Sequence, residues 1–177
     1  INDYNAVLLE DDCVLCKNFK EEIEKVIAQY PNSIINFFTS PSSYWTTHYG
    51  EIFDYNQCTY FPKGITAELA DLMKVKQAKA QSSSYGYILR LVLQNKGIPH
   101  LKYRPCLVNH IDGICGRTKL FMQRNTIYFK DYLDELGITM EEAYKTENRE
   151  KLKEMLEKDR AIWYKDINEY KIRKGIK

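Results

Sequence analysis

The first forty residues place short apolar runs on either side of one amphipathic stretch. Residues 4–10 form an apolar run that turns acidic at its end, as a buried parallel strand does where it stops at a site. Asn18 and Glu21 have capping-box spacing, and Pro31 closes the helical pattern that follows. The apolar positions of that helix are Phe19, Ile23, Val26, Ile27 and Tyr30. Residues 32–39 predict the next strand, so we expect a β-α-β unit with parallel pairing.

The middle of the chain predicts a loop, two helices and an extended stretch. Residues 40–63 are rich in aromatic and small polar side chains without a sustained period, which is typical of a long ordered loop or an irregular hairpin. Residues 66–80 have helical composition, and a second helix opens at Ser84 and ends at Gly97. Residues 98–110 hold an extended stretch that ends in polar groups.

The last part of the chain predicts a helical extension. Thr139 and Glu142 make a second capping box, and no proline follows them. We therefore divide the chain into a main portion, residues 1–138, and a helical extension, residues 139–177. One apolar stripe of the extension is expected to pack on the body or on a partner helix: Leu152, Met155, Leu156, Ile162, Trp163, Ile167 and Tyr170.

Composition narrows the class of protein without naming a function. The 177 residues suit one globular domain, and a net charge of +2 provides no strong global attraction to nucleic acid or anionic membranes. The apolar runs are far shorter than the ~20 residues that span a bilayer. The five cysteines are odd in number and unevenly spaced, which favours free thiols and a cytoplasmic location.

The acidic run Glu10, Asp11 and Asp12 is the first candidate for chemistry. Adjacent carboxylates repel one another, and a divalent cation with oxygen ligands, Mn²⁺ or Mg²⁺, would neutralise them. Because alternate residues of an extended segment point the same way, Glu10 and Asp12 can face one site and Asp11 another. The alternative is a solvated acidic turn that caps the following helix.

A second candidate is the segment from Asn109 to Gly113. His110 and Asp112 can ligate one cation, and Gly113 permits a sharp departure of the backbone. The alternative is a histidine satisfied by the backbone at a strand end, followed by a turn-forming Asp-Gly pair.

Three further segments have weaker signals. Cys13 and Cys16 have the spacing of a redox pair at a helix start, although the neighbouring acids would raise the pKa of both thiols and Cys13 is expected to point into the core. The polar run Gln81, Ser82 and Ser83 before Tyr85 can hold phosphate or sugar oxygens at a helix start, or act as a plain cap. In the aromatic loop, side chains such as Trp45 can stack on sugars or bases, or simply pack.

In this order, the segments resemble the catalytic half of a GT-A glycosyltransferase of family 25, the lipopolysaccharide-biosynthesis type, and its viral relatives. The resemblance covers roughly residues 4–120 and is carried by four segments: Val7-Leu-Leu-Glu-Asp-Asp12, Asn18-Phe19, Ala80-Gln-Ser-Ser-Ser-Tyr-Gly-Tyr-Ile-Leu89 and Pro105-Cys-Leu-Val-Asn-His-Ile-Asp-Gly113. It implies a GT-A-like α/β fold, a Rossmann-like mixed sheet flanked by helices and followed by the helical extension. The family's fold begins with β-α elements that bind the nucleotide base, and this chain starts at the metal strand, so the resemblance implies a GT-A fold incomplete at the N-terminus.

The resemblance also implies an activity: transfer of a sugar from a nucleotide-sugar donor, most simply a UDP-sugar, to a glycan or another hydroxyl acceptor, such as a modified polymer. The metal would be Mn²⁺ or Mg²⁺, held by Asp12 with Glu10 or Asp11 and completed by His110. Residues placed near donor or acceptor are Gln81, Ser82, Ser83, Tyr85 and Trp45. Asp54 and Asp112 are the candidates for a catalytic base. The implied setting is the cytoplasm of a bacterium or of a virus-infected cell.

Two rival functions come from other classes. Asn109-His-Ile-Asp-Gly113 resembles the histidine strand of HNH endonucleases, which leaves Glu10 to Asp12 unexplained and expects a late histidine that the chain lacks after His110. The other rival is a non-catalytic binding or scaffold module derived from a GT-A domain, whose C-terminal helices dock to a protein partner.

Overall fold

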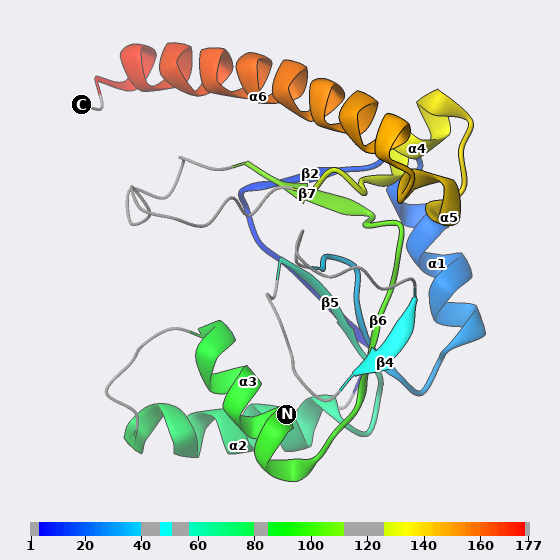
Figure 1. Cartoon of the computed structure of the whole chain (residues 1–177). Helices are drawn as coiled ribbons and strands as arrows, with labels where there is room; N and C mark the ends of the chain where they lie inside the picture. Colours follow the sequence, from blue (N-terminus) through cyan, green and yellow to red (C-terminus); the bar gives the residue numbers. More distant parts are fainter. Residues whose placement is uncertain (1–3, 40–46, 51–56, 80–84, 112–125, 176–177) are drawn as a thin grey trace.

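The computed structural model describes residues 4–39, 47–50, 57–79, 85–111 and 126–175, with the backbone alone at residues 73, 75–79 and 85–87. These residues form a mixed α/β fold, which confirms the class expected from the sequence. Helices α2 (Thr66–Lys79) and α3 (Tyr85–Lys96) cover one side of a central sheet (Figure 1). On the other side lie α1 (Phe19–Gln29), α4 (Lys130–Leu136), α6 (Thr146–Lys174) and a second, smaller sheet.

The central sheet has five short strands in the order β1-β5-β3-β6-β4. Their bounds are β1 (Ala6–Leu9), β3 (Ile34–Asn36), β4 (His48–Gly50), β5 (Cys58–Phe61) and β6 (His100–Lys102). β5 runs antiparallel to both β1 and β3, β3 pairs parallel with β6, and β4 pairs antiparallel with β6. The smaller sheet joins β2 (Cys13–Leu15) to β7 (Val108–His110), which are antiparallel.

The structure corrects the expected β-α-β unit. β1 and β3 do not pair, because β5 lies between them. β1 is an edge strand instead of a buried one, and Val7 and Leu9 are 40% and 42% exposed. β5 lies between β1 and β3 and is buried along its whole length. The expected loop or irregular hairpin at residues 40–63 is also wrong where the structure describes it, since β4 and β5 lie there and pair with other strands of the sheet.

Helix α1 has the predicted extent but a different start. Asn18 makes no side-chain capping bond and has a φ of 53°, so the expected capping box with Glu21 is wrong. The carboxylate of Asp131, on α4, accepts the backbone N–H of Lys17 at 2.9 and 3.1 Å. A distant acidic side chain thus stabilises the positive end of α1.

Two apolar clusters flank the central sheet. The smaller one lies between the sheet and α2/α3, and its buried members include Ile34, Phe61, Leu69 and Leu93. The larger one lies between the sheet and α1, α4 and α6, and its buried members include Ile35, Cys58, Tyr60, Tyr132 and Leu156. Successive strand residues such as Ile34 and Ile35 belong to opposite clusters, as the pleat requires.

The C-terminal helices belong to the larger cluster. Helix α5 (Met140–Ala143) starts with the predicted capping box: Thr139 Oγ1 accepts the Glu142 N–H, and the Glu142 carboxylate accepts the Thr139 N–H. On α6, Leu152 and Leu156 are buried in the cluster together with Tyr132 of α4, so both sides of the expected boundary at residue 139 share one core.

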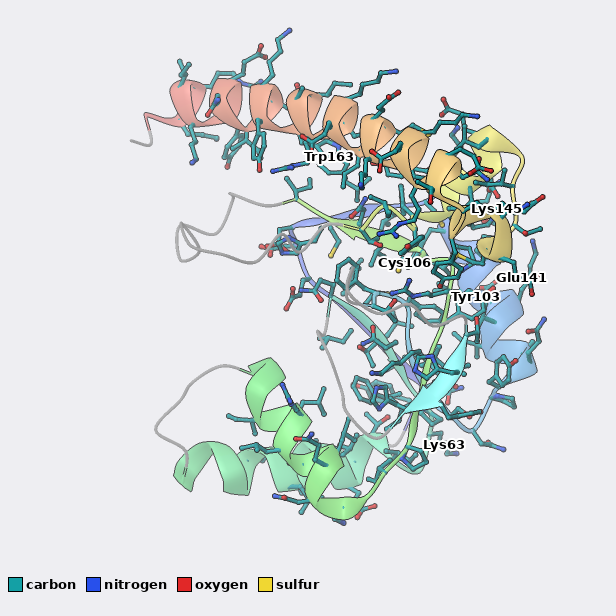
Figure 2. The ribbon with its side chains drawn as sticks, in the orientation of Figure 1. Lys63, Tyr103, Cys106, Glu141, Lys145 and Trp163 are labelled. Carbon is teal, nitrogen blue, oxygen red and sulfur yellow. The ribbon has the colours of Figure 1, made fainter. Side chains whose placement is uncertain are left out.

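The apolar stripe of α6 is only partly covered. The Trp163 side chain points toward the body and packs against the larger cluster (Figure 2). Beyond it, Tyr170 and Ile172 are 51% and 78% exposed, and Ile162 is 56% exposed. The expected packing on the body therefore holds for the first half of the helix and not for its far end.

Three smaller expectations also have outcomes. Helix α3 ends at Gly97, whose φ of 61° permits the reversal that leads into β6. Cys13, Cys16, Cys58 and Cys106 are free thiols, as expected, and Cys115 lies outside the described residues. In the part of the chain that the structure describes, no helix combines the length and the apolar character needed to cross a bilayer.

Candidate metal centre

The acidic run lies where the chain leaves one sheet for the other. β1 ends at Leu9, and the Glu10 N–H still donates to the backbone oxygen of Gln57, at 2.9 Å. After the turn at Asp11 and Asp12, β2 begins at Cys13. The acids are therefore anchored on both sides by strand pairing, although β1 and β2 belong to different sheets.

His110, which is distant from the acidic run in the sequence, lies at the same point in the fold. It is the last residue of β7 and lies opposite Cys13 in the β2–β7 pair. The next N–H, that of Ile111, donates to the backbone oxygen of Asp12 at 2.8 Å. Because this register is fixed by backbone hydrogen bonds on both sides of Cys13, the histidine is brought to the acidic turn by the fold itself.

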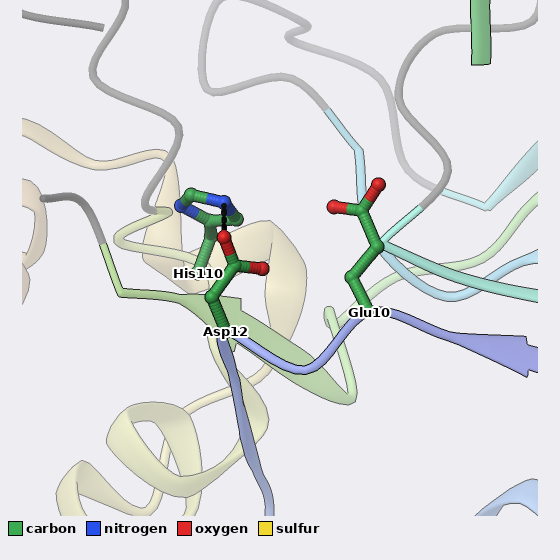
Figure 3. A group of neighbouring side chains, drawn as sticks. All are labelled: Glu10, Asp12 and His110. Carbon is green, nitrogen blue, oxygen red and sulfur yellow. Dashed lines mark ion pairs between the residues drawn. The ribbon is translucent and has the colours of Figure 1, made fainter. Parts of the chain in front are cut away.

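The structure brings Glu10, Asp12 and His110 into one cluster (Figure 3). One ligand atom from each lies within 4.8 Å of the other two, and His110 Nε2 is 3.1 Å from Asp12 Oδ2. The side chains of Asp12 and His110 are about 95% buried, with exposures of 6% and 5%. Asp11 is exposed and lies outside the cluster, but residues 11 and 12 form a turn and not the extended segment from which this separation was expected.

The donor set of the cluster fits a divalent cation. Two carboxylates bring two negative charges, and a protonated His110 would cancel at most one of them. Buried carboxylates are costly unless a positive group neutralises them. Two carboxylate oxygens together with an imidazole nitrogen are suitable ligands for a divalent metal, and the imidazole favours Mn²⁺ over Mg²⁺.

The side chain of Asn109 holds the end of β7, which carries His110, in place. Its side-chain Oδ1 accepts the Thr126 N–H at 2.9 Å and the His110 N–H at 3.1 Å, and its Nδ2 donates to the Thr126 backbone oxygen at 3.1 Å. Asn109 and Thr126 are fully buried. The asparagine therefore fixes the backbone at His110, a positioning role that the sequence did not reveal.

The two thiols of the Cys13 and Cys16 pair are poor redox groups. Burial, followed by the charges of Asp12 and Glu10, raises the pKa of Cys13 far above its ordinary value. Burial also raises the pKa of Cys16 to about 12, with Asp131 as the next contributor. Both thiols stay protonated near neutral pH, and thiol-disulfide exchange requires the thiolate. The redox interpretation of Cys13 and Cys16 has no support in these surroundings.

Several predicted site residues cannot be placed. Both candidate bases, Asp54 and Asp112, lie outside the described residues. The same holds for the expected sugar-binding residues Gln81, Ser82, Ser83 and Trp45. Tyr85 is the first residue of α3, and only its backbone is described.

The structure has a pocket that the sequence did not indicate. It has a volume of about 420 Å³ and is lined by Thr47, Arg104, Thr139, Met140 and Glu141. Arg104 is 4% exposed; its Nε donates to Thr39 Oγ1, and its guanidinium lies 4.9 Å from the centre of the Tyr128 ring. These contacts commit Arg104 to the structure of the pocket wall. None of the three cluster residues lines this pocket.

Comparisons of this chain with models of protein families, with curated proteins and with solved structures find no match. A function is therefore inferred from the residues and geometry of the chain itself.

Proposed function

We propose that this chain is the catalytic portion of a metal-dependent glycosyltransferase with a GT-A-like fold, which uses a nucleotide-sugar donor and a glycan or other hydroxyl acceptor. The observation that carries the proposal is the cluster of Glu10, Asp12 and His110, in which Asp12 and His110 are buried and Glu10 is half-buried. The sequence motifs that resemble family 25 lead to these same residues from two distant parts of the chain. The mixed α/β sheet with a C-terminal helix is compatible with the proposed fold.

In this proposal, each residue of the cluster has a separate task. Asp12 and Glu10 supply the two negative charges that hold the cation, and His110 supplies a nitrogen ligand from the opposite strand. When bound, Mn²⁺ or Mg²⁺ stabilises the negative charge that develops on a diphosphate leaving group, as a Lewis acid does. Asn109 keeps the backbone of His110 fixed, so that the ligand geometry does not have to form anew with each substrate.

The acceptor hydroxyl must lose a proton as the new glycosidic bond forms. We assign this step to one of the two acids named from the sequence, Asp54 or Asp112. Asp112 follows Ile111, whose backbone pairs with Asp12, so Asp112 is close to the cluster along the chain. This makes Asp112 the first of the two to test.

The nuclease remains the second enzymatic candidate, because a buried His110 beside two carboxylates also suits a metal-bound phosphodiester. The scaffold candidate rests on the exposed Ile162, Tyr170 and Ile172 at the far end of α6, which a protein partner could cover. These candidates differ from the glycosyltransferase in what they bind, so a binding experiment separates them.

The experiment is a calorimetric titration of Mn²⁺, followed by UDP and UDP-glucose in the presence of Mn²⁺. It is carried out on the chain itself. The glycosyltransferase proposal expects nucleotide binding that is lost when EDTA removes the metal. Metal binding without nucleotide binding would favour the nuclease, and loss of both would favour the scaffold.

A further inference from the structure

Two buried polar side chains near the metal cluster each have one oxygen atom that forms no hydrogen bond with the residues that the structure describes. Gln57 is 1% exposed and Thr59 is fully buried. Gln57 Oε1 and Thr59 Oγ1 have no hydrogen-bond partner among the residues that the structure describes. Native proteins rarely leave such atoms unpaired, because each costs free energy that a ligand or a water can recover.

The strand register places both side chains on the face of the sheet that carries Glu10. Thr59 lies directly opposite Leu8 of β1, and Leu8 packs in the smaller apolar cluster under α2 and α3. Glu10 comes two residues after Leu8, and Gln57 comes two residues before Thr59, so in this antiparallel pair they lie opposite each other. The Glu10 N–H donates to the Gln57 backbone oxygen. Cross-strand neighbours in this arrangement have Cβ atoms roughly 5 Å apart on the same face. Gln57 is thus the immediate neighbour of a cluster residue.

The opposite face of β5 has a different character. Cys58 and Tyr60 alternate with Gln57 and Thr59 and are packed in the larger apolar cluster. Phe61, on the same face as Thr59, is in the smaller cluster. On this face of the sheet, apolar side chains such as Phe61 are therefore followed, toward the metal cluster, by the polar side chains of Thr59 and Gln57.

The unpaired atoms specify the chemistry of their partner. An amide oxygen only accepts hydrogen bonds, so Gln57 Oε1 requires a donor. The oxygens of an ionised diphosphate only accept, and they cannot satisfy it. A sugar hydroxyl donates and accepts, so it suits both Gln57 Oε1 and Thr59 Oγ1.

We propose that Gln57 and Thr59 form a hydroxyl-recognition subsite for the sugar of the donor, next to the metal cluster that holds its diphosphate. This inference rests on the proposed glycosyltransferase function and adds two specificity residues to it. The two residues are separated along one strand by about 7 Å, which lets them reach different hydroxyls of one sugar ring.

The test replaces each residue by a side chain of similar shape without hydrogen-bonding capacity. Gln57→Met and Thr59→Val are compared with Gln29→Met and Thr146→Val, whose parent residues are exposed. Each protein is titrated, in the presence of Mn²⁺, with UDP-glucose, UDP-galactose, UDP-N-acetylglucosamine and UDP. We expect the two site variants to bind the preferred UDP-sugar about five- to tenfold more weakly, with unchanged affinity for UDP and Mn²⁺.

A second readout separates ligand recognition from a structural role. Thr59→Val removes a buried hydroxyl without a partner, so it is expected to raise the melting temperature of the ligand-free protein by about 2–4 °C while it weakens sugar binding. A lower melting temperature would contradict the inference.

The possible failures are distinguishable. If the wild type binds UDP-sugars and both site variants bind them equally well, the subsite is wrong and the proposed function stands. If the wild type binds no nucleotide in the presence of Mn²⁺, both the subsite and the proposed function are wrong.

Discussion

Replacing Asn109 by alanine tests how the histidine strand is held. The substitution removes three hydrogen bonds at once: two to the backbone of Thr126 and one from the N–H of His110. All three backbone groups belong to residues that are at least 96% buried. Each buried group left unpaired costs about 1–3 kcal/mol, so we expect a loss of about 3–5 kcal/mol after partial relaxation.

The size of this loss can be measured by urea unfolding. A domain of this class has a stability of about 5–15 kcal/mol, so the variant would retain a fold with a melting temperature lowered by roughly 10 °C. The matched control is Asn32→Ala at an exposed position, which is expected to stay within about 0.5 kcal/mol of the wild type. Because Asn109 also fixes His110, the variant should bind Mn²⁺ about 10- to 100-fold more weakly. A loss of stability below about 1 kcal/mol would refute the positioning role of Asn109.

The remaining predictions concern the C-terminal helices. Leu156→Ala should lower the free energy of unfolding by about 2–5 kcal/mol, because Leu156 is 6% exposed in the larger cluster. Ile162→Ala, at a side chain that is 56% exposed, should be nearly neutral in the same urea unfolding assay, and equal effects of the two changes would contradict a shared core. Thr139→Ala should cost about 1 kcal/mol by removing the cap of α5, measured by thermal unfolding, and no change would argue against the capping box. The backbone and side-chain hydrogen bonds from Thr139 lower the pKa of Glu142 below its ordinary value of 4.5. Their contribution to stability is therefore present above pH 4.5 and is lost as the pH falls through the folded-state pKa, so the melting temperature of Glu142→Gln should fall less than that of the wild type between pH 6 and pH 3.

The helices were accessible from the sequence because their signals are local. The apolar period from Phe19 to Tyr30, the end at Gly97 and the capping box at Thr139 each depend on residues within a few positions of one another. The start of α1 was not predictable, because the carboxylate that stabilises it, that of Asp131, comes from a distant part of the chain.

The order of the strands was not accessible from the sequence. The strands have only three or four residues, too few to show a period of two, and the pairing of β1 with β5 joins residues about fifty positions apart. β5 contains buried Thr59 and follows buried Gln57, so its polar positions do not indicate from the sequence that it is an inner strand of the sheet. A loop was the natural expectation for such a mixture of polar and aromatic residues.

The candidate site was partly accessible. The sequence interpretation grouped Glu10 with Asp12 apart from Asp11, which is the grouping in the cluster, although the chain turns at Asp11 and Asp12 instead of staying extended; the polar end of residues 98–110 drew attention to His110. Gln57 and Thr59 could not be singled out from the sequence, because their importance depends on burial and on their register with β1. Whether the cluster binds a metal remains a prediction.

The most direct test of the central proposal is a titration of Mn²⁺ followed by electron paramagnetic resonance, which detects the free ion. Asp12→Asn is compared with Asp11→Asn, a matched change of charge at the exposed neighbour outside the cluster. We expect the wild type to bind one Mn²⁺ tightly and Asp11→Asn to bind it with little change. For Asp12→Asn we expect an affinity reduced more than about 100-fold, because loss of a partner that only supports a metal ligand already costs about 10- to 100-fold and Asp12 is proposed to be a ligand itself. Equal Mn²⁺ binding by all three proteins, or no binding by the wild type, would contradict a metal centre at Glu10, Asp12 and His110.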